Sequence, residues 1–139
     1  MSTFMLTSAI LLEEIPAVPD SNGNRWKVRA LSIGGKNPAL AKLVEWEKTE
    51  KQNFKKIIIS LTMAAKEIRC QNPKWVKKCV NHDVYEAIAH RLEARLMFFY
   101  SEEKAAIICT NHCWKPSDNQ DKAFADCAKL KDFFESHHG

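Results

Sequence analysis

Glycine is scarce in this chain, with four residues in 139. No glycine-rich loop is present that could wrap around a phosphate, and neither a dinucleotide fingerprint, a nucleophile elbow nor an HExxH metal motif occurs. The sequence also lacks an apolar run of about 18 residues, so no membrane-spanning helix is expected. These absences argue against the common nucleotide-dependent enzymes and against an integral membrane protein.

An export signal is also missing. The apolar stretch near the N-terminus has no basic region before it, and Glu13 and Glu14 follow where a cleavable signal would show small residues. We therefore expect a cytoplasmic protein. Cysteines are odd in number, which predicts reduced and mostly buried thiols. They are Cys70, Cys79, Cys109, Cys113 and Cys127.

The composition that is present is that of a folded domain. Hydrophobic residues make up 45% and charged residues 27% of the chain, which predicts a single domain over residues 1–139. The formal net charge of +4 favours a polyanionic partner such as RNA.

The first half of the chain shows two strand patterns followed by two helical ones. Residues 3–12 and 25–33 predict a β-hairpin, so that residues 1–33 form an N-terminal extension of the domain. Asn37 followed by proline predicts a helix start. Apolar residues at helical spacing up to Asn72 then predict a helical hairpin, or one long helix bent near residues 52–53.

The second half predicts a meander of three strands and a closing helix. The strands are expected near residues 84–90, 95–100 and 105–114, and the middle one should be central, because both of its faces are apolar beyond Arg95. Ser117-x-x-Gln120 is a capping-box pattern that opens the last helix. Residues 74–78 are interpreted as a basic connector. The predicted fold class is α+β: an antiparallel β-sheet meander with an N-terminal hairpin, a helical hairpin and a C-terminal helix.

Basic and imidazole side chains gather near the ends of these strands and indicate a groove that could cleave RNA without a metal. Such cleavage needs a group to accept the 2′-OH proton, cations to stabilise the phosphorane, and a proton for the departing 5′ oxygen. Histidine suits the proton transfers, and arginine and lysine suit the charge. The candidate catalytic residues are His90, Arg91, Arg95, His112 and Lys115. The candidate RNA-binding residues are Lys74, Lys77 and Lys78, with Trp114 for base stacking.

Two other kinds of site use the cysteines. Four tetrahedral zinc ligands could come from Cys79, His82, Cys109 and Cys113. A nucleophilic site could pair Cys109 or Cys113 with His90 or His112. Buried free thiols explain the same residues more simply, so neither a metal nor a cofactor is expected.

The ordered set of motifs from residue 76 onward resembles the RelE/ParE toxin superfamily, and within it the HigB-like (phage Gp49-like) branch. The matching segments are Val76–Val80 as the basic connector, Asp83–Glu86 as the Tyr–Glu strand, Arg95–Tyr100 as the arginine–aromatic strand and Ala106–Lys115 as the last strand. The closing helix with Ala123, Ala128 and Leu130 also fits. In the family strand an arginine follows Tyr–Glu–Leu, whereas this sequence has Ile88 there, and a family lysine pair is here the single Lys115.

The resemblance implies a RelE-like fold and a toxin that cleaves messenger RNA, usually on the ribosome. It also implies a cognate antitoxin, of helix-turn-helix type, as partner. By position, Arg95 would stabilise the scissile phosphate and Lys115 would bind backbone or assist proton transfer; His90 and His112 come from chemistry alone. A non-catalytic binding module of the same fold, acting on a protein partner, remains the alternative, and a homodimer is left open.

Overall fold

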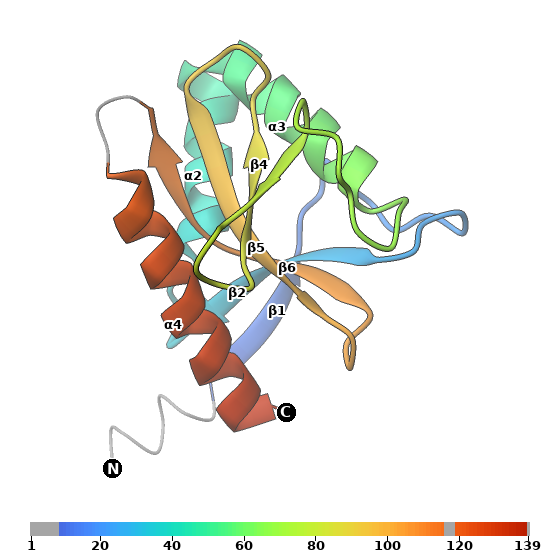
Figure 1. Cartoon of the computed structure of the whole chain (residues 1–139), viewed down its shortest axis with the longest axis vertical. Helices are drawn as coiled ribbons and strands as arrows, with labels where there is room; N and C mark the ends of the chain where they lie inside the picture. The colour runs from blue at the N-terminus through green and yellow to red at the C-terminus, as the bar shows by residue number, and fades with distance from the viewer. Residues whose placement is uncertain (1–8, 116–118, 139) are drawn as a thin grey trace.

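The computed structural model describes residues 9–115 and 119–138. Within them, one six-stranded sheet is covered by three helices (Figure 1). The strands are β1 (Ile10–Glu14), β2 (Lys27–Ile33), β3 (Val76–Lys78), β4 (Tyr85–Ile88), β5 (Ala94–Ser101) and β6 (Ala106–Trp114). The helices are α2 (Pro38–Thr49), α3 (Lys51–Ala64) and α4 (Gln120–His138).

The α+β class is confirmed, and β4, β5 and β6 form the predicted antiparallel meander, but the sheet as a whole is not purely antiparallel. The strand order is β1-β2-β6-β5-β4-β3, and β2 runs parallel to β6, so the sheet is mixed. After β2 the chain crosses one face of the sheet through α2 and α3, and the later strands return to place β6 beside β2. Such a crossover produces a parallel pair. The N-terminal hairpin is confirmed between β1 and β2, with Ile10 opposite Ile33 in an antiparallel register, whereas residues 3–8 of the expected first strand lie outside the described residues.

The expected basic connector contains a strand. Val76 is buried and lies opposite Ala87, so β3 adds an antiparallel edge strand beside β4. Its lysines, Lys77 and Lys78, are exposed. Charged residues on an edge strand oppose pairing with another chain. The interpretation of residues 74–78 as a connector alone was therefore wrong.

The helical hairpin is confirmed, with its break at Glu50, and the Asn37 side chain caps α2 by accepting from the Leu40 N–H at 3.1 Å. However, α3 ends at Ala64 instead of continuing to Asn72. The carbonyl of Ala65 accepts hydrogen bonds from the Arg25 and Trp26 amides, so the chain that follows α3 is tied to the start of β2. This tertiary pairing overrides the helical pattern.

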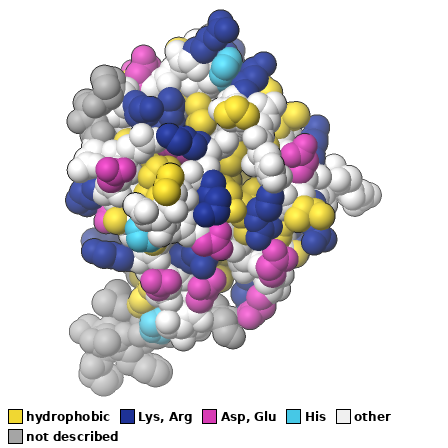
Figure 2. Space-filling model, viewed as in Figure 1, with side chains coloured by type: hydrophobic (Ala, Val, Ile, Leu, Met, Phe, Trp, Pro, Cys, Tyr) yellow, Lys and Arg dark blue, Asp and Glu magenta, His cyan; other side chains and the backbone are white. Residues whose placement is uncertain are grey.

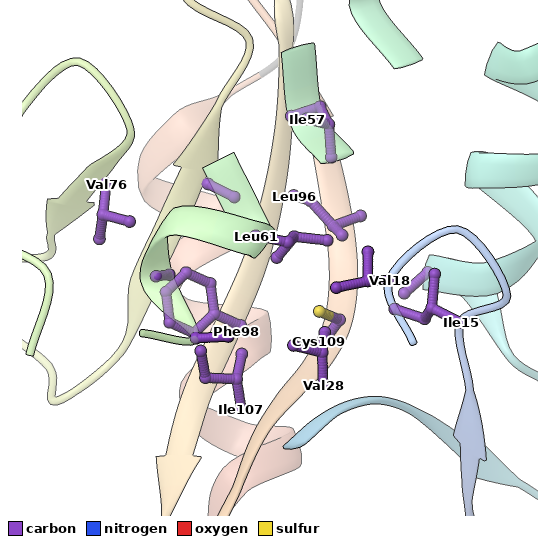
Figure 3. Packing of buried hydrophobic residues seen from close by; sticks show 14 of the residues in the cluster. Ile15, Val18, Val28, Ile57, Leu61, Val76, Leu96, Phe98, Ile107 and Cys109 are labelled. Carbon is purple, nitrogen blue, oxygen red and sulfur yellow. The ribbon is translucent and has the colours of Figure 1, made fainter. Parts of the chain in front are cut away.

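β5 is central and covered on both faces, as its sequence predicts. Leu96 and Phe98 are buried on the side of α3, where Figure 3 shows them packed against Leu61. Met97 and Phe99 are buried on the opposite side, beneath α4. The sheet therefore has two hydrophobic cores, and a residue's position along β5 or β6 decides which side it faces.

α4 packs on the sheet through Ala123, Phe124, Cys127 and Phe134. Ser117 of the expected capping box lies outside the described residues. The Asn119 side chain accepts from the Lys122 N–H at 3.1 Å and so caps the start of α4. None of the helices described is long and apolar enough to cross a bilayer.

Candidate functional site

A buried carboxyl group lies at the centre of the candidate site. Glu86, in β4, is 1% exposed and points to the side of the sheet that α4 covers. Its Oε2 accepts a hydrogen bond of 2.6 Å from Nε2 of Gln120, the first residue of α4. Its Oε1 is buried and has no hydrogen-bond partner among the described residues. Burial raises the pKa of Glu86, so the carboxyl has an unusual affinity for a proton.

Three cations surround this carboxyl, and we call them the cation cluster: Lys77, Arg95 and Lys115. Their positive charges, together with the Gln120 hydrogen bond, oppose the rise in the pKa of Glu86. They come from β3, from β5 and from the residue after β6, so three strands direct positive charge to one end of one sheet face. Figure 2 shows Lys and Arg side chains over the upper and middle parts of the molecule, with apolar side chains between them. No ion pair within 4.0 Å joins the described cluster to Glu86.

The turn before β5 holds Arg95 and Lys115 in place. An Arg95 guanidinium nitrogen, Nη1, donates to the carbonyls of Leu92 at 2.7 Å and Ala94 at 2.8 Å. The Lys115 backbone N–H donates to the Glu93 carbonyl at 3.0 Å. Burial lowers the pKa of Arg95, although arginine remains protonated at any physiological pH. The Arg95 guanidinium and the Lys115 backbone are therefore held by the same three-residue segment.

His90 and Arg91 lie in the tight turn between β4 and β5. Arg91 has φ of 66°, in the left-handed region, and the Leu92 N–H closes the turn on the Ala89 carbonyl at 2.8 Å. His90 lies beside Trp75, with ring centroids 6.5 Å apart.

The His90 imidazole lies among positively charged side chains. Partial burial, together with the positive charges of Lys74, Arg91 and Lys56, lowers the pKa of His90. A neutral imidazole is therefore favoured near neutral pH, and it can accept a proton. Lys74 also stacks on Trp75, with its Nζ 4.8 Å from the ring centroid.

His112 and Trp114 face the other side of the sheet. They lie on the α2 side of β6, where Trp46 is 6.1 Å from His112 and 6.4 Å from Trp114 between ring centroids. Because successive residues of a strand alternate, Cys113 between them faces α4. The sheet therefore separates this aromatic group from Arg95.

The sequence-derived candidates thus occupy three places at one end of the sheet: the cation cluster under α4, the β4–β5 turn, and the α2 side of β6. Lys77 joins the cluster, but its neighbour Lys78 turns away. The Lys78 Nζ donates to the carbonyl of Cys79 at 3.3 Å and to that of His82 at 3.4 Å.

The cysteine-based alternatives do not agree with this geometry. Cys109 belongs to the core on the α3 side, whereas Cys79 and Cys113 belong to the core under α4. No group of three or more metal-ligating side chains is found in the part of the chain that the structure describes. Complete burial raises the pKa of Cys109, which disfavours a nucleophilic thiolate. The four-residue zinc site is therefore wrong.

Sequence reasoning missed Glu86, Gln120 and Trp46. A signal for Glu86 was present, because it is a carboxylate between Tyr85 and Ala87 in a strand rich in apolar residues. Gln120 and Trp46 carry no such signal, since their roles depend on how α4 and α2 pack on the sheet. No protein-family model, curated protein or solved structure matches the chain.

Proposed function

We propose that this protein is an RNA-cleaving toxin of the RelE/HigB type, a cytoplasmic endoribonuclease that cleaves messenger RNA on the ribosome. The observation that supports this proposal is the cation cluster around Glu86. Three cations at one end of a rigid sheet suit a phosphodiester, whose charge would pair with them more fully than the single buried carboxyl does.

Each cation would have a distinct part in binding the scissile phosphate. Arg95 uses one guanidinium nitrogen on backbone carbonyls, which orients the planar group and leaves further N–H donors for phosphate oxygens. Lys77 and Lys115 would supply point charges on either side of it. Positioning and charge stabilisation of this kind can provide much of the rate enhancement in phosphoryl transfer.

The reaction itself would need no metal. The 2′ oxygen attacks the adjacent phosphorus, the bond from phosphorus to the 5′ oxygen breaks, and the products carry a 2′,3′-cyclic phosphate and a 5′-OH. The 2′ proton passes to a base and a second proton reaches the 5′ oxygen. His90, neutral and beside Arg91, is the proton acceptor that we place nearest this role. Lys115 would assist the departing oxygen.

A second function is favoured by a different observation. A cavity of about 440 Å³, between the end of β1 and the α2–α3 pair, is lined mainly by apolar side chains and flanked by Glu14 and Glu47. Such a site suits an amphipathic peptide with an apolar anchor and basic flanks. The protein would then act, or be neutralised by an antitoxin, through protein binding at this cavity.

Induced expression in a bacterial host separates the two functions. If the protein cleaves RNA, its expression should arrest growth, and Arg95→Ala should relieve the arrest. Val44→Glu, in the apolar cavity, should leave the arrest unchanged. Arrest that survives Arg95→Ala but disappears with Val44→Glu would favour the protein-binding function instead.

A further inference from the structure

A cavity of about 220 Å³ lies on the α2 side of the same sheet end, away from the cation cluster. Its aromatic walls are Trp46, His112 and Trp114. The Trp46 ring is inclined by 40° to that of Trp114 and by 76° to that of His112. Because Trp46 is only 2% exposed, the core holds its ring rigidly. We call this cavity the aromatic pocket.

The polar rim of the aromatic pocket comes from the second half of α2 and the residue after it. Lys42 forms an ion pair of 3.2 Å with Glu45, and the Thr49 hydroxyl donates to the Glu45 carbonyl at 2.9 Å. The Glu50 carboxylate, in contrast, makes no side-chain hydrogen bond or ion pair within the described part of the chain. The rim therefore presents one carboxylate whose two oxygens remain available to a ligand.

We propose that the aromatic pocket binds a guanine base of the RNA, an inference that rests on the proposed function. A flat base can stack on tryptophan and histidine rings. The Watson–Crick edge of guanine carries two adjacent donors, N1–H and N2–H, which one carboxylate accepts together. Adenine, cytosine and uracil lack that pair of donors. The acidic rim also repels phosphate, so the base enters and the backbone stays outside.

The register of the sheet connects this pocket to the cation cluster. Trp114 lies opposite Ala94, so it is next in sequence to Lys115 and directly across from the residue before Arg95. An RNA strand could bind the cation cluster through one phosphate and then cross the ends of β5 and β6. A nucleotide next to that phosphate would then reach the aromatic pocket. The pocket would then select cleavage sites that have guanine near the scissile bond.

Free nucleosides test the pocket without the phosphate site. Tryptophan fluorescence of the whole chain is titrated with guanosine, adenosine, cytidine and uridine. We expect saturable quenching by guanosine, weakened about tenfold or more in Glu50→Gln and in Trp114→Ala. Glu47→Gln, three residues before Glu50 but facing another cavity, is the matched control and should bind guanosine as the wild type does. An equal response to all four nucleosides, no response to guanosine, or a wild-type response in Glu50→Gln would overturn the proposal.

Uncleavable RNA separates this inference from the proposed function. Two 2′-O-methyl oligonucleotides that differ by one guanine-to-uracil exchange are compared by fluorescence anisotropy. Glu50→Gln should remove the preference for the guanine-containing oligonucleotide, whereas Arg95→Ala should weaken the binding of both oligonucleotides equally. If the wild type binds the two oligonucleotides equally, the guanine pocket is contradicted, but the proposed function is not. Failure to bind either one contradicts the proposed function, and the nucleoside titration then decides the pocket by itself.

Discussion

The side-chain amide of Gln120 donates to the Glu86 carboxyl across 2.6 Å, and this contact joins the first turn of α4 to β4, the first strand of the C-terminal meander. The bond fixes the start of α4 beside the cation cluster. It also satisfies one oxygen of a carboxyl that is otherwise surrounded by apolar side chains and positive charge. Glu86 therefore interacts both with α4, through Gln120, and with the positive charges of the cation cluster.

Glu86 should make the stability of the fold dependent on pH. Burial raises its pKa above the usual value of 4.5, so the folded state binds the proton more tightly than the unfolded state. The Glu86 contribution to the free energy of unfolding is then largest below that value and declines as pH rises through the folded-state pKa. Each unit of elevation corresponds to about 1.4 kcal/mol.

Urea unfolding of the wild type and of Glu86→Gln across pH 4 to 8 measures this effect. The difference between the two variants should change in favour of Glu86→Gln as pH rises. Parallel pH profiles would show that the carboxyl titrates normally in the folded protein.

The cation cluster should dominate RNA affinity and its dependence on salt. Removing one phosphate contact with Arg95→Ala or Lys115→Ala should weaken binding of every sequence and reduce the slope of log affinity against log salt by about 1. Lys129→Ala, an exposed lysine farther along α4, is the control. Anisotropy titrations at several salt concentrations measure the slopes. Equal slopes for all three variants would contradict a phosphate role for the cluster.

At Arg91, glycine should be a more stabilising substitute than alanine, which is the reverse of the usual order. Its φ of 66° lies in the left-handed region, which costs residues with a Cβ about 1 kcal/mol and costs glycine little. Arg91→Gly should therefore be more stable than Arg91→Ala by about 1 kcal/mol, although both lose the charge and should bind RNA less tightly. Chemical denaturation gives the order, and a more stable Arg91→Ala would argue against this turn conformation.

Asn53 should stabilise the backbone next to Arg95. It is 4% exposed, and its side-chain oxygen accepts from the Ala94 N–H at 2.8 Å, one residue before Arg95. Asn53→Ala leaves that buried N–H without a partner and should cost about 1–3 kcal/mol of the free energy of unfolding. Gln52→Ala, exposed on the same helix, should change stability by less than about 0.5 kcal/mol. Equal losses in the two variants would contradict a specific role for the Asn53 bond.

Much of the fold follows from the sequence, because periodicity reports burial directly. The apolar faces of residues 95–100 predicted a central strand covered on both sides, and Asn37-Pro38 predicted the start of α2. The parallel pairing of β2 with β6 has no local signal, since it depends on where the helical crossover returns. The early end of α3 arises in the same way, from Trp26 and residues distant in sequence.

The candidate site was harder to predict, because a sheet has two faces. The sequence brings Arg95, His112 and Lys115 near strand ends, but alternation along β6 sends His112 to the α2 side. Glu86 was missed for a related reason: its apolar neighbours indicated a buried strand, but a carboxylate in a strand ordinarily points to solvent, and here the packing of α4 buries it.

The most direct measurement maps the ends of a translated message in a purified translation reaction. With the wild-type protein added, we expect new fragments with a 2′,3′-cyclic phosphate on one side of each cut and a 5′-OH on the other. These fragments should form without any metal cofactor added for the protein. Arg95→Ala, folded and at equal concentration, should produce few or none. An intact message with the wild-type protein, or the same fragments with Arg95→Ala, would contradict the claim that the cation cluster cleaves RNA.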